Sequence, residues 1–385
     1  MKQWTLWELP FFGPEHSKLE AALQRWRDDF PRIEKAIEPL PLDEQCRVLG
    51  RELGRAGLLE YAVPDPVAGG TVDVRAACMI REALSYDSPL ADFVFAMQGI
   101  GSAAIWLFGS EEQKRTYLAG SRDGSRLAAF AMSEPDGSSD VASMTTRARI
   151  DGDDYVIDGV KTWISNGGIA NQYIVIARTE DMPGSKGLSA ILVDADTPGL
   201  TIESRIDIIA PHPLATIRFE GCRVPRSQLI GEPGAGFRMA MSTLDIFRTS
   251  VGGAAVGLAR RALDETVERM RGRHLFGKQM SEMDTVRMRV ADMTLDLESA
   301  VLLVYRAAWL KDTAGRSVTR EVALAKLGAT EAAQRVIDSA VQLFGGMGVT
   351  IGSVIERLYR DIRPMRIYEG ASEVQKIIIG RKMLG

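Results

Sequence analysis

The chain has 385 residues with a formal net charge of −4, and its residues are 45% hydrophobic and 25% charged. These values are typical of a globular protein with a sizeable core, divided into about two or three domains. The balance of charge argues against a function based on binding nucleic acid or an anionic membrane.

The sequence contains three cysteines without CxxC spacing and three widely separated histidines. This pattern indicates neither a disulfide framework nor a metal site. The first residues lack a basic region followed by an apolar one, so no signal peptide is expected. No stretch approaches ~20 consecutive apolar residues, so no transmembrane helix is expected either. We therefore expect a soluble, cytoplasmic protein without membrane insertion.

Helix formers with apolar residues at helical spacing dominate the first third of the chain. They predict helices over residues 15–38, 42–57, 71–89 and 102–121. From about residue 126 to 231 the segments become short and β-rich, with turn signals between them. Three pairs, Asp151-Gly152, Asp158-Gly159 and Asn166-Gly167, are interpreted as tight turns. Short strands spaced in this way favour an antiparallel sheet.

The last third returns to helical periodicity. One long apolar stripe comprises Val286, Val290, Met293, Leu297, Val301 and Val304. Long helices with short connections predict a bundle. The expected fold class is α+β, with an N-terminal helical domain (residues 1–124), a central antiparallel β domain (125–232) and a C-terminal four-helix bundle (233–385).

Glycine-rich motifs do not support nucleotide-binding folds of the common kinds. The stretch GGMGVTIG follows a predicted helix, whereas a Rossmann fingerprint follows a strand. The sequence also has no Walker A motif and no GxSxG elbow.

Two motifs of the β region indicate a ligand site. FAMSEPDGSSDVASM starts at Phe130, and DGVKTWISNGG places Trp163 and Ser165 two residues apart on a predicted strand. Residues two apart point to one face of a regular strand. An indole and a hydroxyl on one face could flank a planar ligand. A buried tryptophan and a turn serine are the alternative interpretation.

Near the C-terminus, Glu369 lies on a predicted link between two helices. Pro364 disfavours continuation of the preceding helix. Ser372 and Gln375 have the spacing of a capping box for the next helix. Gly370 permits a close approach of the backbone to a ligand. A carboxylate on a link between rigid helices is a candidate catalytic group.

Five ordered motifs together resemble the acyl-CoA dehydrogenase family. They are FAMSEPDGSSDVASMTT, IDGVKTWISNGG, GRHLFGKQM, QLFGGMG and RDIRPMRIYEGASEVQ. The resemblance implies the helix–β–helix architecture and FAD as the cofactor. It also implies α,β-dehydrogenation of an acyl-CoA thioester to the trans-2-enoyl-CoA. A base removes the α proton, and flavin N5 accepts the hydride from the β carbon.

The resemblance assigns a role to each matching residue. Glu369 matches the catalytic base, Ser133 a contact of the flavin pyrimidine edge, and Trp163 the aromatic that covers the flavin ring. Asp245 and Arg248 match a pair that contacts CoA. The implied FAD-binding residues are Phe130, Met132, Ser133, Trp163 and Ser165, and, across a subunit interface, Arg273, Phe276, Gln342, Gly345 and Gly346. The implied substrate-binding residues are Ser139, Asp245, Arg248, Tyr368 and Gly370.

Three positions depart from the family pattern: Leu275, Asp284 and Ala371, all beside expected FAD contacts. The implied partners are an acyl-CoA substrate, an electron-transfer flavoprotein and further copies of the chain in a homotetramer built as a dimer of dimers. We expect a neutral acyl group that is short, branched or cyclic. Action on a carrier-protein thioester, an oxygen-using oxidase and a non-catalytic helical scaffold remain alternatives.

Overall fold

The computed structural model describes residues 9–137 and 140–385. The predicted substrate contact Ser139 lies outside these residues. Two compact units make up the chain. The first comprises Met1–Asp28, Asp73–Asp92 and Asp245–Gly385, and the second comprises Asp29–Val72 and Phe93–Leu244. The boundaries of the three expected domains stay a prediction.

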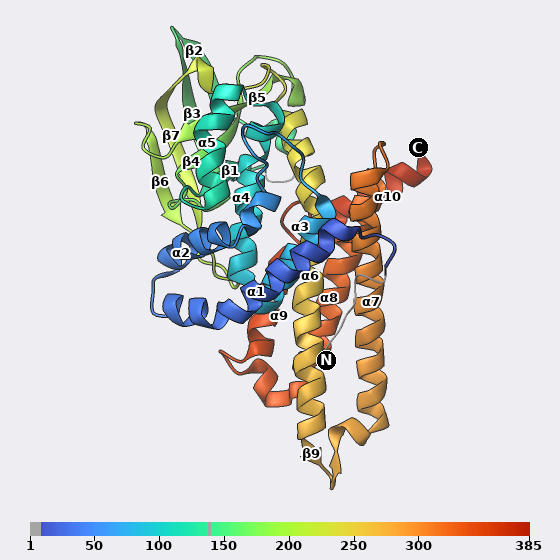
Figure 1. Ribbon diagram of the computed structural model, residues 1–385. Helices are drawn as coiled ribbons and strands as arrows, with labels where there is room; N and C mark the ends of the chain where they lie inside the picture. The colour runs from blue at the N-terminus through green and yellow to red at the C-terminus, as the bar shows by residue number, and fades with distance from the viewer. Residues whose placement is uncertain (1–8, 138–139) are drawn as a thin grey trace. The chain divides into compact units, whose positions relative to one another are not determined.

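Helices precede and follow a central sheet, which confirms the predicted fold class (Figure 1). The helices before the sheet are α1 (Pro14–Ile37), α2 (Leu42–Arg55), α3 (Val74–Asp87), α4 (Pro89–Phe108) and α5 (Glu111–Asp123). Those after it are α6 (Gly236–Gly272), α7 (Asp284–Thr313), α8 (Thr319–Phe344), α9 (Val354–Met365) and α10 (Ser372–Leu384).

The sheet has the strand order β6-β7-β3-β2-β4-β5-β8, with β1 also paired to β4. Its pairings are antiparallel except that β1 and β2 run parallel to β4. The side chains of β4 and β5 are almost all buried, as the apolar runs of their sequences suggest. The bounds are β1 (Ala128–Ala131), β2 (Arg147–Asp151), β3 (Asp154–Ser165), β4 (Gln172–Arg178), β5 (Leu188–Asp194), β6 (Leu200–Arg205), β7 (Leu214–Pro225) and β8 (Leu229–Ile230).

Only the first of the three predicted turn pairs is a hairpin turn. Asp151 ends β2 and pairs with Asp154 of β3, with Gly152 at φ +64° between them. Gly159 instead lies inside β3 at a register shift, where a Cβ would come 2.5 Å from Thr146 Oγ1. Asn166 and Gly167 do lie in a turn, which follows β3 without forming a hairpin; Asn166 has φ +59°, and its side chain donates to the Ala128 carbonyl. Turn dipeptides thus also mark a bulge and a strand end in this sheet.

Within the second unit, α4 packs closely on β1. A Cβ on Gly101 would lie 2.7 Å from the Ala128 Cβ, so only glycine fits there. Gln98 fixes the register by accepting from the Ala128 amide and donating to the Arg126 carbonyl. By length and composition α4 could cross a membrane, contrary to the sequence expectation, but 78% of its apolar window is buried. Such burial is typical of a core helix.

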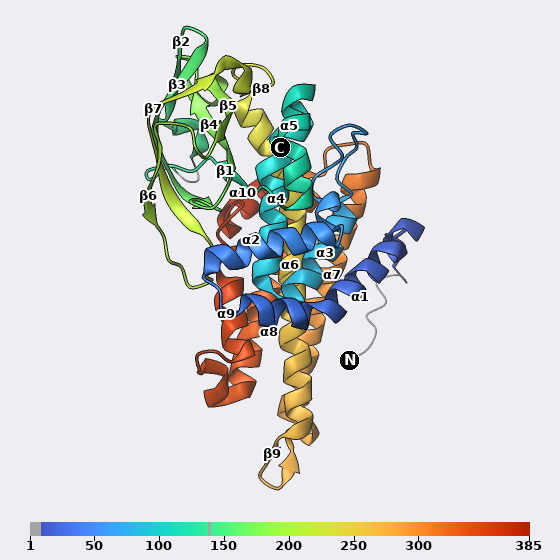
Figure 2. The same ribbon diagram turned by 60° about the vertical axis from the view of Figure 1, so that its left-hand side comes forward.

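Within the first unit, α7 and α8 lie side by side (Figure 1), and α8 also packs against α9 (Figure 2). Buried polar groups tie three helices together. Glu82 on α3 accepts from Arg260 Nε on α6 at 2.8 Å and from the Tyr305 hydroxyl on α7 at 2.5 Å. Since all three side chains are at least nine-tenths buried, this network fixes how α3, α6 and α7 pack.

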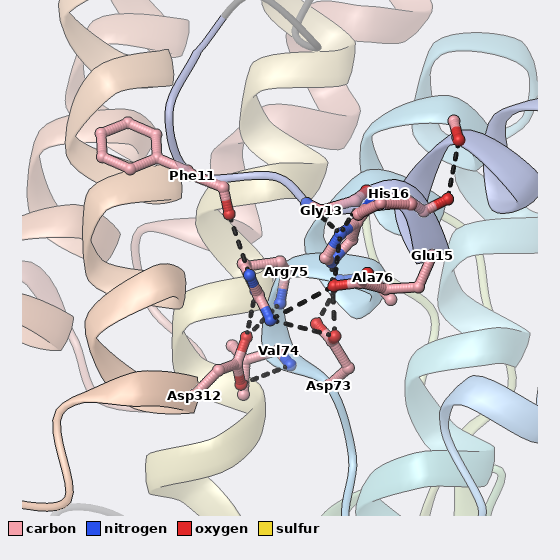
Figure 3. A network of polar contacts seen from close by, with 11 residues as sticks. Phe11, Gly13, Glu15, His16, Asp73, Val74, Arg75, Ala76 and Asp312 are labelled. Carbon is pink, nitrogen blue, oxygen red and sulfur yellow. Dashed lines mark hydrogen bonds and ion pairs between the residues drawn. The ribbon is translucent and has the colours of Figure 1, made fainter.

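A second network joins the segment before α1 to α3 and α7 (Figure 3). Arg75 donates to Asp312 at 2.9 Å and to the Phe11 carbonyl. The buried His16 lies 3.3 Å from Asp73, which caps α3. His16, Glu15 and Asp73 could offer metal ligands, contrary to the scattered pattern read from the sequence. The Arg75 guanidinium, 3.4 Å from Asp73 Oδ2, already supplies a positive charge there.

Candidate active site

Met132 and Ser133 lie beside β3 because Lys161 and Thr162 bind their carbonyl groups. Lys161 Nζ donates to the Met132 carbonyl at 3.0 Å, and the Thr162 amide donates to the Ser133 carbonyl at 3.0 Å. Phe130 is the half-buried third residue of β1. The structure therefore brings Phe130, Met132 and Ser133 next to the strand that carries Trp163 and Ser165, as the predicted flavin site requires.

The buried pair of Lys161 and Glu134 holds this arrangement. Lys161 Nζ donates to Glu134 Oε1 at 2.9 Å, while Glu134 also accepts from the Thr145 and Thr146 amides. Burial opposes the charge of Glu134, but Lys161 and the threonine donors outweigh it and lower the pKa of Glu134 to about 2. Burial lowers the pKa of Lys161 to about 8, although the negative charge of Glu134 opposes this shift.

Trp163 does not follow the regular alternation of a strand. Its backbone is left-handed at φ +58°, within a register shift between Lys161 and Ile164. The argument that put Trp163 and Ser165 on one face therefore fails. The side chain is 54% exposed, so the alternative interpretation of a buried tryptophan is also wrong. Left-handed backbone at a bulky residue is costly and is common at ligand sites.

The link that carries Glu369 runs from the end of α9 to the start of α10. Glu369 and Gly370 both have left-handed backbone, with φ of +53° and +94°. The predicted capping box is absent: Ser372 donates to Glu331 at 2.6 Å, and Gln375 donates to the Gly370 carbonyl at 2.9 Å. The two side chains thus hold the link instead of capping α10.

Arg248 also holds the link. Its Nε donates to the Glu369 carbonyl at 3.1 Å, and its Nη1 donates to Asp245 at 3.2 Å. The Arg248 side chain is 7% exposed, so it faces the Glu369 backbone rather than open solvent. The pairing of Asp245 with Arg248 follows from their i,i+3 spacing on α6. Their predicted contact with CoA stays a prediction.

Glu369 is half-buried, and its carboxylate oxygen Oε2 is buried without a hydrogen-bond partner. Burial raises the pKa of Glu369, opposed first by Arg81 and then by Arg248 and Lys326. The negative charge of Asp92, like burial, raises the pKa of Glu369. A carboxyl group with a free oxygen and a raised pKa is suited to accept a proton. Sequence reasoning missed Arg81 and Lys326, although Lys326 is a lone charge inside an apolar helical run. Arg81 is followed directly by Glu82 and carries no such signal.

A third group of predicted residues lies at one end of the bundle. Arg273 follows α6, and its Nη1 lies 3.5 Å from the carbonyl of Phe344, the last residue of α8. Phe276 is 95% exposed at the turn between β9 (His274–Leu275) and β10 (Lys278–Gln279), with φ +52°. The nearby Gln342, Gly345 and Gly346 are also exposed.

Two of the departures from the family pattern, Leu275 and Asp284, lie near this group and have local explanations. Leu275 packs against the small buried cluster of Met270, Met280 and Val286. The carboxylate of Asp284 lies 3.3 Å from Arg287, which offsets its charge. Ala371 precedes α10 without a side-chain cap, and nothing in the structure explains the alanine there.

Comparison with known proteins gives matches along most of the chain. Profiles described as acyl-CoA dehydrogenase N-terminal, middle and C-terminal domains match residues 20–125, 129–222 and 234–384. The mitochondrial short-chain specific acyl-CoA dehydrogenase of Rattus norvegicus is 38% identical over 337 residues, covering 87% of this chain and 82% of that protein.

Solved structures agree with these matches. A structure from work on the electron transferring flavoprotein of Acidaminococcus fermentans superposes with a TM-score of 0.90 at 32% identity, covering 97% of this chain and 98% of the other. An acyl-CoA dehydrogenase complexed with FAD from Bacillus anthracis gives 0.87 at 30% identity, covering 97% of this chain and 67% of the other.

The fold and these matches define a flavoprotein oxidoreductase of fatty acid metabolism. The chain belongs to the acyl-CoA dehydrogenase family, and its cofactor is FAD. The residues present fit that cofactor. The exposed indole of Trp163 offers an aromatic surface, and the Lys161 contacts order the adjoining Met132–Ser133 segment.

Proposed function

We propose that the protein catalyses α,β-dehydrogenation of a short acyl-CoA thioester to the trans-2-enoyl-CoA, with Glu369 as the base. The observation that carries this proposal is the environment of Glu369. Its carboxylate has a free, buried oxygen, and the pKa is raised by burial while three buried cations favour the ionised form. This balance keeps a carboxylate available whose pKa is shifted toward neutral pH, as a general base requires.

Each group of residues has a separate part in the proposed reaction. Arg248 holds the carbonyl of Glu369, so the carboxylate keeps one orientation toward the α carbon. The main-chain amide of Glu369 donates to the thioester oxygen and stabilises its developing charge. Trp163 and Ser133 bind the cofactor. FAD, when bound, supplies the hydride acceptor.

A short acyl group is proposed because the rat relative is named short-chain specific. The test is an anaerobic panel of acyl-CoA thioesters of increasing length, with branched and dicarboxylic members, read by bleaching of the flavin absorbance. Fastest bleaching by neutral short or branched substrates supports the proposal. Equal or faster bleaching by glutaryl-CoA contradicts the neutral substrate.

The role of Glu369 is tested with Glu369→Gln and a matched Glu268→Gln control, which changes an exposed glutamate of α6. We expect Glu369→Gln to stay yellow but to lose bleaching by substrate, because the amide cannot accept the proton. The control should bleach at the wild-type rate. Bleaching of Glu369→Gln at that rate would place the base elsewhere.

The alternatives are decided by the same preparation. Bleaching by a carrier-protein thioester in preference to the CoA thioester favours the carrier-protein reaction. Rapid reoxidation of the reduced flavin by dioxygen favours an oxidase. Reoxidation by an electron-transfer flavoprotein, with slow reaction toward dioxygen, supports the proposed dehydrogenase. A colourless protein would favour the scaffold.

We also propose that the chain forms a homotetramer. Four apolar residues of α7 recur every seven positions and are at least one-third exposed: Met288, Leu295, Leu302 and Trp309. Seven-residue spacing of apolar side chains is typical of helix seams between chains. The exposed Phe276 offers a second contact for a partner copy, which fits the expected binding of FAD across subunits.

A further inference from the structure

Lys326 lies at an unusual place, inside the buried face of α8. It is 0% exposed among small apolar neighbours of the same helix, including Ala325 and Ala329. A buried ammonium is costly unless polar partners compensate for the lost water. Within the described residues, Lys326 Nζ donates to the Gly370 carbonyl at 2.9 Å and forms no ion pair with a carboxylate.

The charged groups around Lys326 come from each element packed against it. Burial lowers the pKa of Lys326 to about 8. The strongest opposing effect, which raises this pKa, comes from the charge of Glu369 on the link. Glu331 on α8 and Glu373 on α10 also raise the pKa of Lys326, whereas Arg248 on α6 lowers it. The principal electrostatic partner of Lys326 is therefore the proposed catalytic base.

Two buried cations hold successive carbonyl groups of the link. Arg248 binds the Glu369 carbonyl at 3.1 Å, and Lys326 binds the Gly370 carbonyl at 2.9 Å. Gln375 adds a second donor to the Gly370 carbonyl. Left-handed backbone at a non-glycine residue such as Glu369 is strained and persists only where the surroundings enforce it. These three donors supply that constraint.

We propose that Lys326 is a positioning residue for the dehydrogenation, holding the link through Gly370 and keeping the Glu369 carboxylate ionised and correctly placed. This inference rests on the proposed function. A displacement of about 1 Å at a catalytic group can cost roughly 100-fold in rate, so loss of the contact has a measurable effect.

The test uses the FAD-loaded enzyme and the variants Lys326→Met, Lys326→Gln and Lys326→Arg. Lys376→Met, at an exposed position of α10, is the matched control. Lys326→Met should slow flavin reduction by saturating acyl-CoA roughly 10- to 100-fold with little change in KM. Lys326→Gln should recover part of the rate because its amide can still donate. The control should behave as the wild type.

The pH profile gives a readout that a merely structural role would not move. In the wild type, the reduction rate should fall as pH rises through about 8, because Lys326 loses its proton there. Lys326→Arg should retain most of the rate and lack this fall, because arginine stays charged. An identical alkaline fall in Lys326→Arg and the wild type overturns the inference. So does an unchanged rate in Lys326→Met.

Amide hydrogen exchange of the peptide spanning residues 366–375 separates this inference from the proposed function. Faster exchange in Lys326→Met than in Lys376→Met supports the contact without reference to activity. If that occurs while no acyl-CoA bleaches the wild type, the proposed function fails and the holding of the link stands. If exchange is unchanged while the wild type is bleached, the inference fails alone.

Discussion

Arg81 and Asp92 form a two-point ion pair that is almost completely shielded from water. The pair joins Nε to Oδ1 at 2.7 Å and Nη2 to Oδ2 at 2.9 Å, and both side chains are at most 3% exposed. Arg81 also donates to Ser250 on α6 and contributes to the potential at Glu369. The pair therefore joins the packing of α3 to the electrostatics of the proposed base.

Removing one member of this pair should destabilise the protein strongly. Asp92→Leu leaves the Arg81 charge buried and unpaired, and we expect a loss of about 3–5 kcal/mol in the free energy of unfolding. Denaturant titration measures it. The double variant Arg81→Met/Asp92→Leu should recover a large part of the lost free energy of unfolding, since it removes both charges. A double variant no more stable than Asp92→Leu would contradict this account.

The pair of Glu134 and Lys161 predicts a loss of stability in acid. The folded-state pKa of Glu134 is lowered from 4.5 to about 2. Its contribution is therefore fully present above pH 4.5 and is lost as pH falls from there toward 2. Unfolding free energies measured between pH 6 and pH 2 should fall less steeply in Glu134→Gln. Equal slopes in the two proteins would contradict the assignment.

Arg248 should influence both the rate and the pH at which the base ionises. Because its charge lowers the raised pKa of Glu369, Arg248→Met should move the acid limb of the flavin-reduction profile to higher pH. It should also reduce the maximal rate by roughly 10-fold or more, because the Glu369 carbonyl loses its donor. Arg271→Met, at an exposed position of α6, is the control. If the acid limb of the profile does not move in Arg248→Met, the charge of Arg248 does not influence the ionisation of Glu369.

The apolar stripe on α7 predicts the effect of charge on assembly. The double variant Leu295→Glu/Leu302→Glu should have a lower molar mass, measured by light scattering during gel filtration. The reason is that an interface between subunits does not accept unpaired carboxylates. Met182→Glu, at another exposed methionine, is the control. Retention of the tetramer mass by the double variant would exclude this stripe as a contact between subunits.

The sequence predicted the order of helices and strands because periodicity is local. It also predicted that Met132, Ser133 and Trp163 come together, through motifs that carried the resemblance. It did not predict the bulge at Trp163, because strand alternation assumes regular pairing. The capping box at Ser372 failed since Glu331, 41 positions away in the chain, binds that hydroxyl.

The residues that sequence reasoning missed share one property. Each contacts a residue far along the chain: Lys326 donates to Gly370, and Arg81, besides its ion pair with Asp92, donates to Ser250. A charge inside an apolar helical run marks Lys326, but it does not identify the partner. Only the folded packing of α3, α6 and α8 does.

The left-handed residues suggest a way to find the site without any ligand. Among the described non-glycine residues, Trp163, Asn166, Phe276 and Glu369 have positive φ. A variant library sorted only for folded protein should enrich glycine at Trp163, Phe276 and Glu369, where it relieves strain. Asn166 should be retained because its side chain binds Ala128. A second sorting for flavin reduction should reverse the three glycine enrichments, so the difference between the two selections would outline the catalytic machinery.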